Sequence, residues 1–351
     1  MEIKKELFGE LESTKVFEYT LANNNGYSLS VTTYGAIITK LMMPDKEGTI
    51  ENITVNFETL DEIVQSRPFH GAIIGPVSGR ISKASYQDGE KEIVLEKNEN
   101  GNNLHSGFTG IDQHVWTATT KEEENQVSLI LNTTSPDGES GFPGDIEVIV
   151  TYTLNEQNEV AISYEAKTNK RTLFNPTNHV YFNLNGHKQE LIHNHKLKVN
   201  SDKFAVLDDE NIPTGELREV DGTDFDLREF RTLSEVLASE EEQIKDRTGY
   251  DHPFVLNQDK NTPAVVLKEE SSGRVLEMRT DEEVVVIFTH NSEKVPVTDK
   301  ETTLPVHAGI TLETCALPDA VNQEGFGSVW LEPGETFQST TVFSLEVESF
   351  E

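Results

Sequence analysis

The sequence is short of cysteine and of long apolar runs, and each shortage excludes a class of protein. Cys315 is the single cysteine of the 351 residues, so the chain can form neither an intrachain disulfide nor a zinc site of several thiolates. The longest apolar runs, such as Val284–Phe288, fall far short of the roughly 20 residues that cross a bilayer. Residues 1–5 lack the apolar stretch of a secretory signal. We therefore expect a cytoplasmic protein without a membrane span.

Basic residues are also scarce. The chain has 29 Lys and Arg against 62 Asp and Glu, a formal net charge of −33. Such a chain repels phosphate backbones and anionic lipid headgroups, so we expect neither nucleic acid nor membranes as partners. A neutral small molecule is the expected ligand. The acidic runs at residues 122–124, 240–242 and 281–283 are interpreted as solvated surface, although a cation site or a partner-binding segment would look similar.

What the sequence does contain is apolar and polar residues in alternation with a period of two, which is typical of half-buried strands. The pattern is clearest in residues 146–154 and recurs in residues 27–31, 127–131 and 160–164. Parallel α/β folds need a helix between most successive strands, and helical patterns are rare here. The predicted fold class is therefore all-β, either a sandwich or a barrel.

Helices are expected in only two short places. Each begins with the capping-box pattern Thr-x-x-Glu, first at Thr59 and Glu62 and later at Thr232 and Glu235. No stretch has the composition of a linker, and no repeat is visible. We therefore expect residues 1–351 to form a single domain.

Five polar segments carry the residue types that handle sugars and protons, at residues 75–81, 102–107, 175–184, 249–256 and 312–322. The first places glycines around Arg80, whose forked guanidinium can hold hydroxyl or ring oxygens. An arginine that only bridges two loops would give the same pattern. A phosphate-binding loop is disfavoured, because no Gly-Lys-Ser/Thr follows.

The third segment places His179 in a strand-like run. If Phe182 and Leu184 point to the core, alternation puts His179, Tyr181 and Asn183 on the opposite face, which could line a pocket. A single histidine in such a run can equally be a structural residue with its hydrogen bonds satisfied.

The remaining segments supply His105, Asp251 and Glu313. Glu313 follows Ile310 and Leu312 in an alternating apolar run, where burial would raise its pKa and make it a better base near neutral pH. An exposed acid, one among many, is the alternative interpretation.

A metal site is a further alternative. His193-x-His195 would place two imidazoles on one face of a strand, but no third ligand with identifiable spacing accompanies them. We therefore favour edge-strand histidines and expect no metal.

Taken together, the segments resemble the aldose 1-epimerases, or galactose mutarotases. The matching motifs occur in the family's order and cover nearly the whole chain: Gly79-Arg80, Asn103-Leu104-His105-x-Gly107, Gly141-Phe142-Pro143-Gly144, Thr177-Asn178-His179-x-Tyr181-Phe182-Asn183-Leu184, Tyr250-Asp251-His252, Glu313-Thr314, Pro318-Asp319-Ala320-x-Asn322 and Leu331-Glu332-Pro333-Gly334-Glu335. The resemblance implies one large β-sandwich with a sugar cleft across it. It also implies an isomerase that interconverts the α and β anomers of free aldoses by opening and reclosing the ring.

The resemblance assigns roles to five residues. It implies Glu313 as general base and His179 as general acid, with Arg80, His105 and Asp251 as sugar-binding groups. A carboxylate and an imidazolium suit the two proton transfers because both can titrate near neutral pH. No redox or metal cofactor is implied, and the expected partner is a small sugar.

Three positions depart from the family pattern. Cys315 stands where Gln is frequent, Ser106 where Gly is common, and Lys83 where Asn is often found. None removes a proposed catalytic group, so the departures bear on sugar preference and pocket shape. A cysteine nucleophile is disfavoured, because no independent base is placed for Cys315.

Three other functions would use some of the same residues. A non-catalytic carbohydrate-binding protein would not require both His179 and Glu313. A glycoside hydrolase could use Asp251 and Glu313 as its two carboxylates, but would leave the histidines unexplained. A hexose-phosphate 1-epimerase of the same superfamily should show extra cations for the phosphate, and no obvious cluster is present. The preferred aldose or reducing disaccharide and the oligomeric state stay open.

Overall fold

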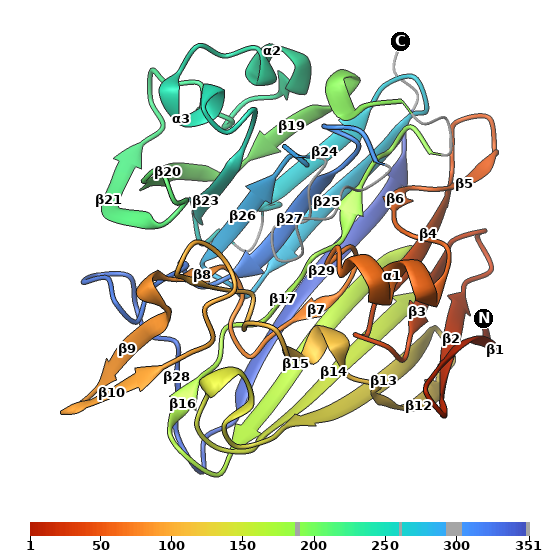
Figure 1. The fold of residues 1–351 in the computed structure, drawn as a ribbon. Helices are drawn as coiled ribbons and strands as arrows, with labels where there is room; N and C mark the ends of the chain where they lie inside the picture. Colours follow the sequence, from red (N-terminus) through yellow and green to blue (C-terminus); the bar gives the residue numbers. More distant parts are fainter. Residues whose placement is uncertain (187–189, 260–261, 293–303, 349–351) are drawn as a thin grey trace.

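The computed structural model describes residues 1–186, 190–259, 262–292 and 304–348, which fold mainly as β-strands (Figure 1). Within these residues, no helix is long and apolar enough to cross a membrane. The predicted all-β fold class is confirmed.

The largest sheet has nine antiparallel strands. Their order is β12 (Thr117–Glu122), β13 (Gln126–Ser135), β14 (Ile146–Asn155), β15 (Glu159–Thr168), β29 (Phe337–Val347), β25 (Arg274–Thr280), β24 (Val265–Glu269), β19 (Lys196–Val199) and β22 (Arg231–Thr232). In β14 every second residue from Ile146 is buried, while the residues between are exposed or half-buried. This is the alternation that predicted the strand.

A seven-stranded sheet and a five-stranded sheet pack against the first. The seven-stranded order is β21 (Pro213–Glu219), β20 (Ser201–Leu207), β23 (Asp251–Leu256), β26 (Val284–Phe288), β27 (Ile310–Cys315), β18 (Tyr181–Phe182) and β6 (Thr54–Val55). The five-stranded order is β1 (Glu2–Leu11), β2 (Thr14–Ala22), β3 (Ser28–Thr32), β4 (Ile38–Pro44) and β5 (Ile50–Asn52). Four strand pairs complete the described sheets: β9 (Ser85–Asp88) with β10 (Lys91–Val94), β8 (Arg80–Ile81) with β11 (Asn103–Leu104), β7 (Ile73–Ile74) with β17 (Thr177–Asn178), and β16 (Thr172–Leu173) with β28 (Trp330–Leu331).

The nine- and seven-stranded sheets are joined face to face. The rings of Phe182 and Phe343 lie 5.2 Å apart, and the hydroxyls of Thr314 and Thr341 are 2.7 Å apart. One core cluster takes buried side chains from all three large sheets. Each such side chain contributes about 1.5–3 kcal/mol of burial free energy, so the sandwich is held together mainly by this shared core.

The helices are short and lie between strands. α1 (Leu60–Ser66) begins at Thr59 with the predicted capping box formed. α2 (Leu233–Leu237) also forms where predicted, but the Thr232 side chain makes no capping hydrogen bond. α3 (Glu242–Lys245) begins within an acidic run and has no predicted counterpart. The 3₁₀ turns are η1 (Ser82–Ala84), η2 (Ile111–Gln113), η3 (Glu139–Gly141) and η4 (Ile192–Asn194).

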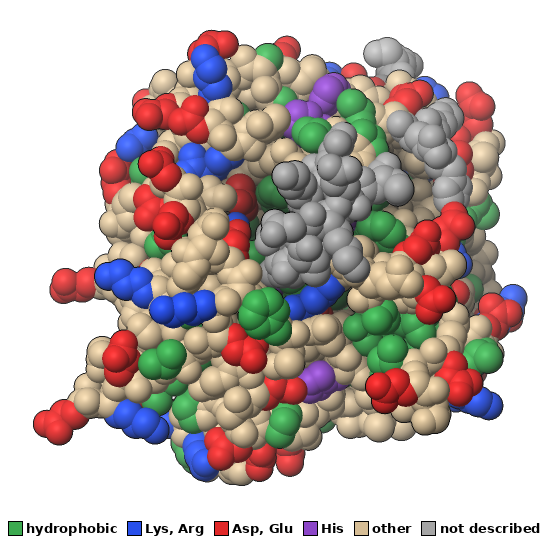
Figure 2. All heavy atoms as spheres, in the orientation of Figure 1, with side chains coloured by type: hydrophobic (Ala, Val, Ile, Leu, Met, Phe, Trp, Pro, Cys, Tyr) green, Lys and Arg blue, Asp and Glu red, His purple; other side chains and the backbone are tan. Residues whose placement is uncertain are grey.

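Acidic side chains are spread over the molecular face in Figure 2, with Lys and Arg between them. This distribution agrees with the large negative net charge. Most residues of the three acidic runs are exposed, but Glu241 and Glu282 are half-buried.

Candidate active site

A cavity of about 630 Å³ opens on the face of the seven-stranded sheet that points away from the shared core. Alternation along β26 and β27 produces this face. Val285, Ile287 and Leu312 belong to the core, whereas Val286 and Glu313 line the cavity. All five predicted site residues line this same cavity, although they come from segments far apart in sequence.

Glu313 and His179 are neighbours at the wall of the cavity. His179 Nε2 lies 3.3 Å from Glu313 Oε1, and both residues are about 95% buried. The same carboxylate oxygen accepts a hydrogen bond of 2.9 Å from the Thr311 hydroxyl. The backbone of His179 pairs with the segment that connects α1 to β7, because its N–H donates to the Ala72 carbonyl and its carbonyl accepts from the Gly71 N–H. Both reactive groups are therefore fixed in position by the fold.

The prediction for the face around His179 is partly right. Tyr181 lines the cavity and Phe182 packs in the core, as alternation requires. Asn183 is absent from the described cavity lining, because its amide donates to the carbonyls of Glu190 and Ala308.

His105 is oriented by a backbone hydrogen bond. The Gly79 N–H donates to His105 Nδ1 at 3.1 Å, so in the neutral ring the proton sits on Nε2, which is then a hydrogen-bond donor. Gly79 has a φ of +70°, and an added Cβ would lie 3.1 Å from Pro318. Glycine is needed here for both conformation and space.

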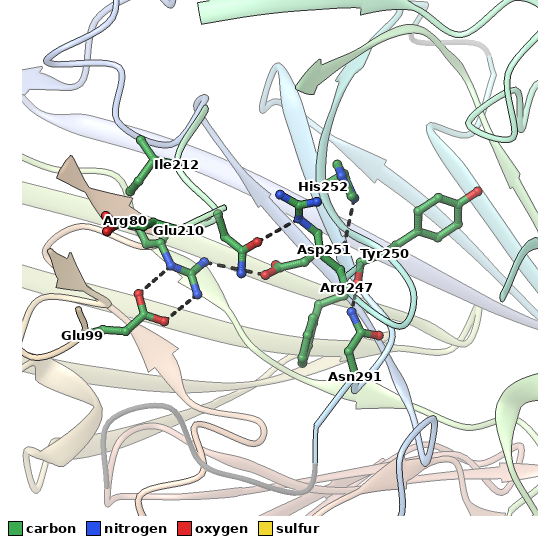
Figure 3. Close-up of polar contacts among 12 residues, drawn as sticks. Arg80, Glu99, Glu210, Ile212, Arg247, Tyr250, Asp251, His252 and Asn291 are labelled. Carbon is green, nitrogen blue, oxygen red and sulfur yellow. Dashed lines mark hydrogen bonds and ion pairs between the residues drawn. The ribbon is translucent and has the colours of Figure 1, made fainter. Parts of the chain in front are cut away.

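Arg80 lies between two carboxylates (Figure 3). Its Nε and Nη2 each donate to Glu99 at 2.7 Å, and its Nη1 is 3.7 Å from Asp251. The β8–β11 pairing and the turn after Glu99 bring these groups together. A two-point contact of this kind fixes the plane of the guanidinium.

Burial dominates the protonation of the site. It raises the pKa of Glu313 to about 8, against the opposing effects of Thr311 and Arg80. It lowers the pKa of His179 to about 4 and raises the pKa of Asp251 to about 6. The raised Glu313 pKa agrees with the expectation from its apolar strand. The expectation that His179 titrates near neutral pH is wrong, because burial lowers its pKa. Burial thus favours the neutral form of both groups, a protonated Glu313 carboxyl group and an uncharged His179 imidazole.

The described lining of the cavity carries more acids than cations. Two arginines, Arg80 and Arg247, face five acids: Glu99, Asp209, Asp246, Asp251 and Glu313. Arg247 is engaged by Asn211 and by the carbonyls of Asp208 and Gln243. A phosphate group would meet no additional cation cluster among these residues.

His193 and His195 do not form a shared ligand face. His195 is buried and its Nε2 accepts the Leu184 N–H, whereas His193 is exposed and pairs with His307. The favoured interpretation as edge-strand histidines is wrong, because His193 lies in the 3₁₀ turn η4 and His195 directly follows that turn. The described part of the chain holds one group of three potential ligands close enough for a metal, His105, His179 and Glu313. His105 is unsuited to that role, because Gly79 occupies Nδ1 and the inward Nε2 carries the proton.

The three residues that depart from the family pattern lie in different places. Cys315 is buried and lines the cavity beside Glu313. Ser106 lies outside the described lining, where its hydroxyl bonds both backbone groups of Val77. Lys83 adopts a φ of +56° within η1, and its N–H donates to Asn102.

Several residues of the cavity had no signal in the sequence. Glu99 lines the cavity and accepts a hydrogen bond from Arg80, and Thr311, outside the described lining, donates one to Glu313. His70 and His290 also line the cavity, but each is a single histidine outside any recognised motif. Their placement depends on tertiary structure.

Fold and site together define a class of protein: a large antiparallel β-sandwich whose cavity pairs a carboxylate with an imidazole, as general acid–base chemistry requires. The family model for aldose 1-epimerase matches residues 18–344. The chain is 35% identical to galactose mutarotase of Mus musculus, over 98% of this chain and 99% of the relative. It is 34% identical to aldose 1-epimerase of Streptococcus thermophilus, over 96% of each.

The fold agrees with these sequence similarities. The crystal structure of galactose 1-epimerase from Lactobacillus acidophilus NCFM superposes with a TM-score of 0.88 at 28% identity, with 99% of each chain covered. The chain belongs to the aldose 1-epimerase family. The resemblance predicted from the motifs, and the sandwich that it implies, are confirmed.

Proposed function

We propose that this protein is an aldose 1-epimerase that interconverts the α and β anomers of free aldoses. The observation that carries the proposal is the 3.3 Å contact of His179 with Glu313 inside a cavity large enough for a sugar. Family membership supports the same reaction.

In the proposed mechanism, the Glu313 carboxylate removes the proton of the C1 hydroxyl while the His179 imidazolium protonates the ring oxygen. The bond between C1 and the ring oxygen breaks, and C1 becomes an aldehyde carbonyl. Rotation about the C1–C2 bond presents the other carbonyl face. The ring oxygen then attacks C1, His179 takes back its proton, and Glu313 returns the other to the C1 oxygen.

One proton on the pair is sufficient for this cycle. In the free site the pKa values place that proton on Glu313. Its transfer to His179, over the existing contact, gives the carboxylate and imidazolium that the first step uses. The reactive state and the resting state therefore have the same total charge.

Arg80, Asp251 and His105 are proposed to hold the remaining hydroxyls while the chain is open. The two-point contact with Glu99 fixes the Arg80 guanidinium, and the His105 Nε2–H is directed by Gly79. Holding the open chain raises the effective concentration of the ring oxygen at C1.

The proposed substrates are neutral aldoses such as galactose or glucose, or a reducing disaccharide. Hexose 6-phosphates should be poor substrates, because both arginines of the described cavity lining already have protein partners. A kcat/KM that favours the phosphorylated sugar would overturn this assignment.

Polarimetry tests the proposed reaction. Freshly dissolved α-anomers of galactose, glucose and maltose should equilibrate faster with enzyme, and chelator treatment should leave the rate unchanged. Unchanged rotation rates with all three sugars at high enzyme concentration would instead favour a binding protein.

The proposal treats residues 1–351 as one domain, because a single core cluster draws on all three large sheets. Calorimetry should give one unfolding transition whose calorimetric and van't Hoff enthalpies agree. Two separable transitions would contradict it.

The proposal also includes a cytoplasmic location, as the single thiol of Cys315 suggests, and cell fractionation would check it.

A further inference from the structure

Three rings beside His179 are not used by the proposed mechanism. His70 and Tyr181 stack with ring centroids 4.0 Å apart and planes 21° apart. The ring of His290 lies 5.5 Å from His70 and 5.4 Å from Tyr181. All three side chains line the cavity, and each histidine is 3% exposed.

Both histidines bury a nitrogen without a partner. His70 Nε2 and His290 Nδ1 have no hydrogen-bond partner among the described residues. Most buried polar atoms in proteins are paired, so an unpaired nitrogen in a cavity wall indicates a group that a ligand satisfies.

The protonation of His70 follows from its other nitrogen. His70 Nδ1 lies 2.9 Å from the Pro68 carbonyl oxygen. A carbonyl only accepts, so Nδ1 carries the proton and Nε2 presents a lone pair. Stacking on Tyr181 holds the ring in this orientation. The natural partner of Nε2 is a hydroxyl, which can donate to it.

We propose that His70 and His290 determine sugar specificity by binding hydroxyl groups of the aldose through His70 Nε2 and His290 Nδ1. The inference rests on the proposed function, since it deepens the description of the same site. A hydroxyl fits His290 with either ring nitrogen protonated, because hydroxyls both donate and accept. The group of potential metal ligands found among the described residues includes neither histidine, so sugar hydroxyls are favoured over a metal.

The test uses His70→Phe and His290→Phe with the preferred aldose and its 2-, 3-, 4- and 6-deoxy analogues. Phenylalanine keeps a ring against Tyr181 but removes the nitrogen. For the wild type, removing a contacted hydroxyl should lower kcat/KM by about 3- to 10-fold, the value of one neutral hydrogen bond. In the matching variant, the ratio between parent sugar and that analogue should fall to about 1, with most of the change in KM.

Two controls separate recognition from packing. His70→Gln keeps an acceptor and should restore part of the discrimination, whereas a packing role would not distinguish Gln from other substitutions of its size. His193→Phe removes an exposed histidine outside the described cavity lining and should keep the wild-type ratios. Wild-type ratios for all four analogues in both test variants would overturn the inference.

Equilibrium binding keeps this test independent of catalysis. Methyl glycosides cannot mutarotate, so calorimetry with methyl glycosides of the same deoxy series measures hydroxyl recognition even if a variant, or the wild type, is inactive in polarimetry. Absence of wild-type mutarotation would contradict the proposed function, whereas equal binding losses in wild type and variants would contradict the histidine inference. Tight Zn²⁺ binding that His70→Phe or His290→Phe abolishes would also overturn it in favour of a metal site.

Discussion

The two sides of the cavity differ in whether their polar groups already have protein partners. Beside Asp251, the Arg80 guanidinium is held by two hydrogen bonds to Glu99. Beside Tyr181, the rings of His70 and His290 each leave a buried nitrogen unpaired. The first side is preorganised before a ligand enters, and the second retains hydrogen-bonding capacity for one. We therefore propose that Arg80 orients the sugar and that His70 and His290 discriminate between sugars.

Glu313→Gln should have the largest effect, because it removes the proposed general base. Glutamine keeps the size of the side chain but cannot accept the C1 proton, so kcat should fall by roughly 10² to 10⁴ fold. Polarimetry measures kcat, and the affinity for a methyl glycoside measures binding. Binding should largely survive the substitution.

Glu18→Gln is a matched control for that substitution. Glu18 is buried at 8% exposure and accepts a hydrogen bond from the Thr39 hydroxyl at 2.6 Å, much as Glu313 does from Thr311. It lies outside the described cavity lining, so kcat should stay near the wild-type value. Near-normal kcat in Glu313→Gln would mean that the base is misassigned, with Asp251 the next candidate.

The pH profile sharpens the assignment of the single shared proton. Above the Glu313 pKa of about 8, the pair loses its proton and none remains for the ring oxygen, so kcat/KM should fall about tenfold per pH unit. Below about 6, Asp251 becomes neutral, and near 4 His179 takes up a second proton. Activity should therefore peak between about pH 6 and 8.

Residual activity of Glu313→Gln tests the alkaline limb of that profile. The limb should disappear in this variant, because the group that titrates there is gone. An alkaline limb with the wild-type midpoint would assign it to another group.

The sequence predicts elements whose pattern lies within one segment. It misses contacts that form only when segments distant in sequence come together. Alternation predicted β14 because one face of that strand is buried along its whole length. Arg80 and Glu313 lie in motifs, so the resemblance could suggest them. Glu99 could not be found in this way, since its role exists only after β8 and β11 pair. The solvated interpretation of residues 240–242 likewise concealed the start of α3.

Glu99→Gln weakens the contact that orients Arg80 and leaves Glu313 and His179 unchanged. The neutral amide gives a weaker partner to Arg80, whose fork can then turn away from its productive plane. We expect kcat/KM to fall about tenfold, the value of one charge-assisted hydrogen bond, mainly through KM. The pH profile should keep its alkaline limb. A loss confined to kcat, or a lost limb, would place Glu99 in proton transfer instead of positioning.

Ser106→Gly should have the smallest effect, because Ser106 belongs to neither wall. Its hydroxyl accepts from the Val77 N–H at 2.8 Å and donates to the Val77 carbonyl at 2.9 Å, so loss of these bonds destabilises the fold. The φ of +66° at this position is readily adopted by glycine, which offsets part of that loss. The free energy of unfolding should change by about 1 kcal/mol or less, as measured by urea denaturation.

The ratio of kcat/KM for galactose and glucose should meanwhile stay within about twofold of the wild type in Ser106→Gly, since a twofold change is about 0.4 kcal/mol. Cys315→Gln is the informative contrast, because Cys315 lines the cavity beside Glu313 and a longer amide there would reach into the space of the sugar. It should shift the ratio further than Ser106→Gly does. If Ser106→Gly shifts the ratio more, sugar preference is set by the loop that contains Ser106. The assignment of sugar preference to residues that line the cavity is then wrong.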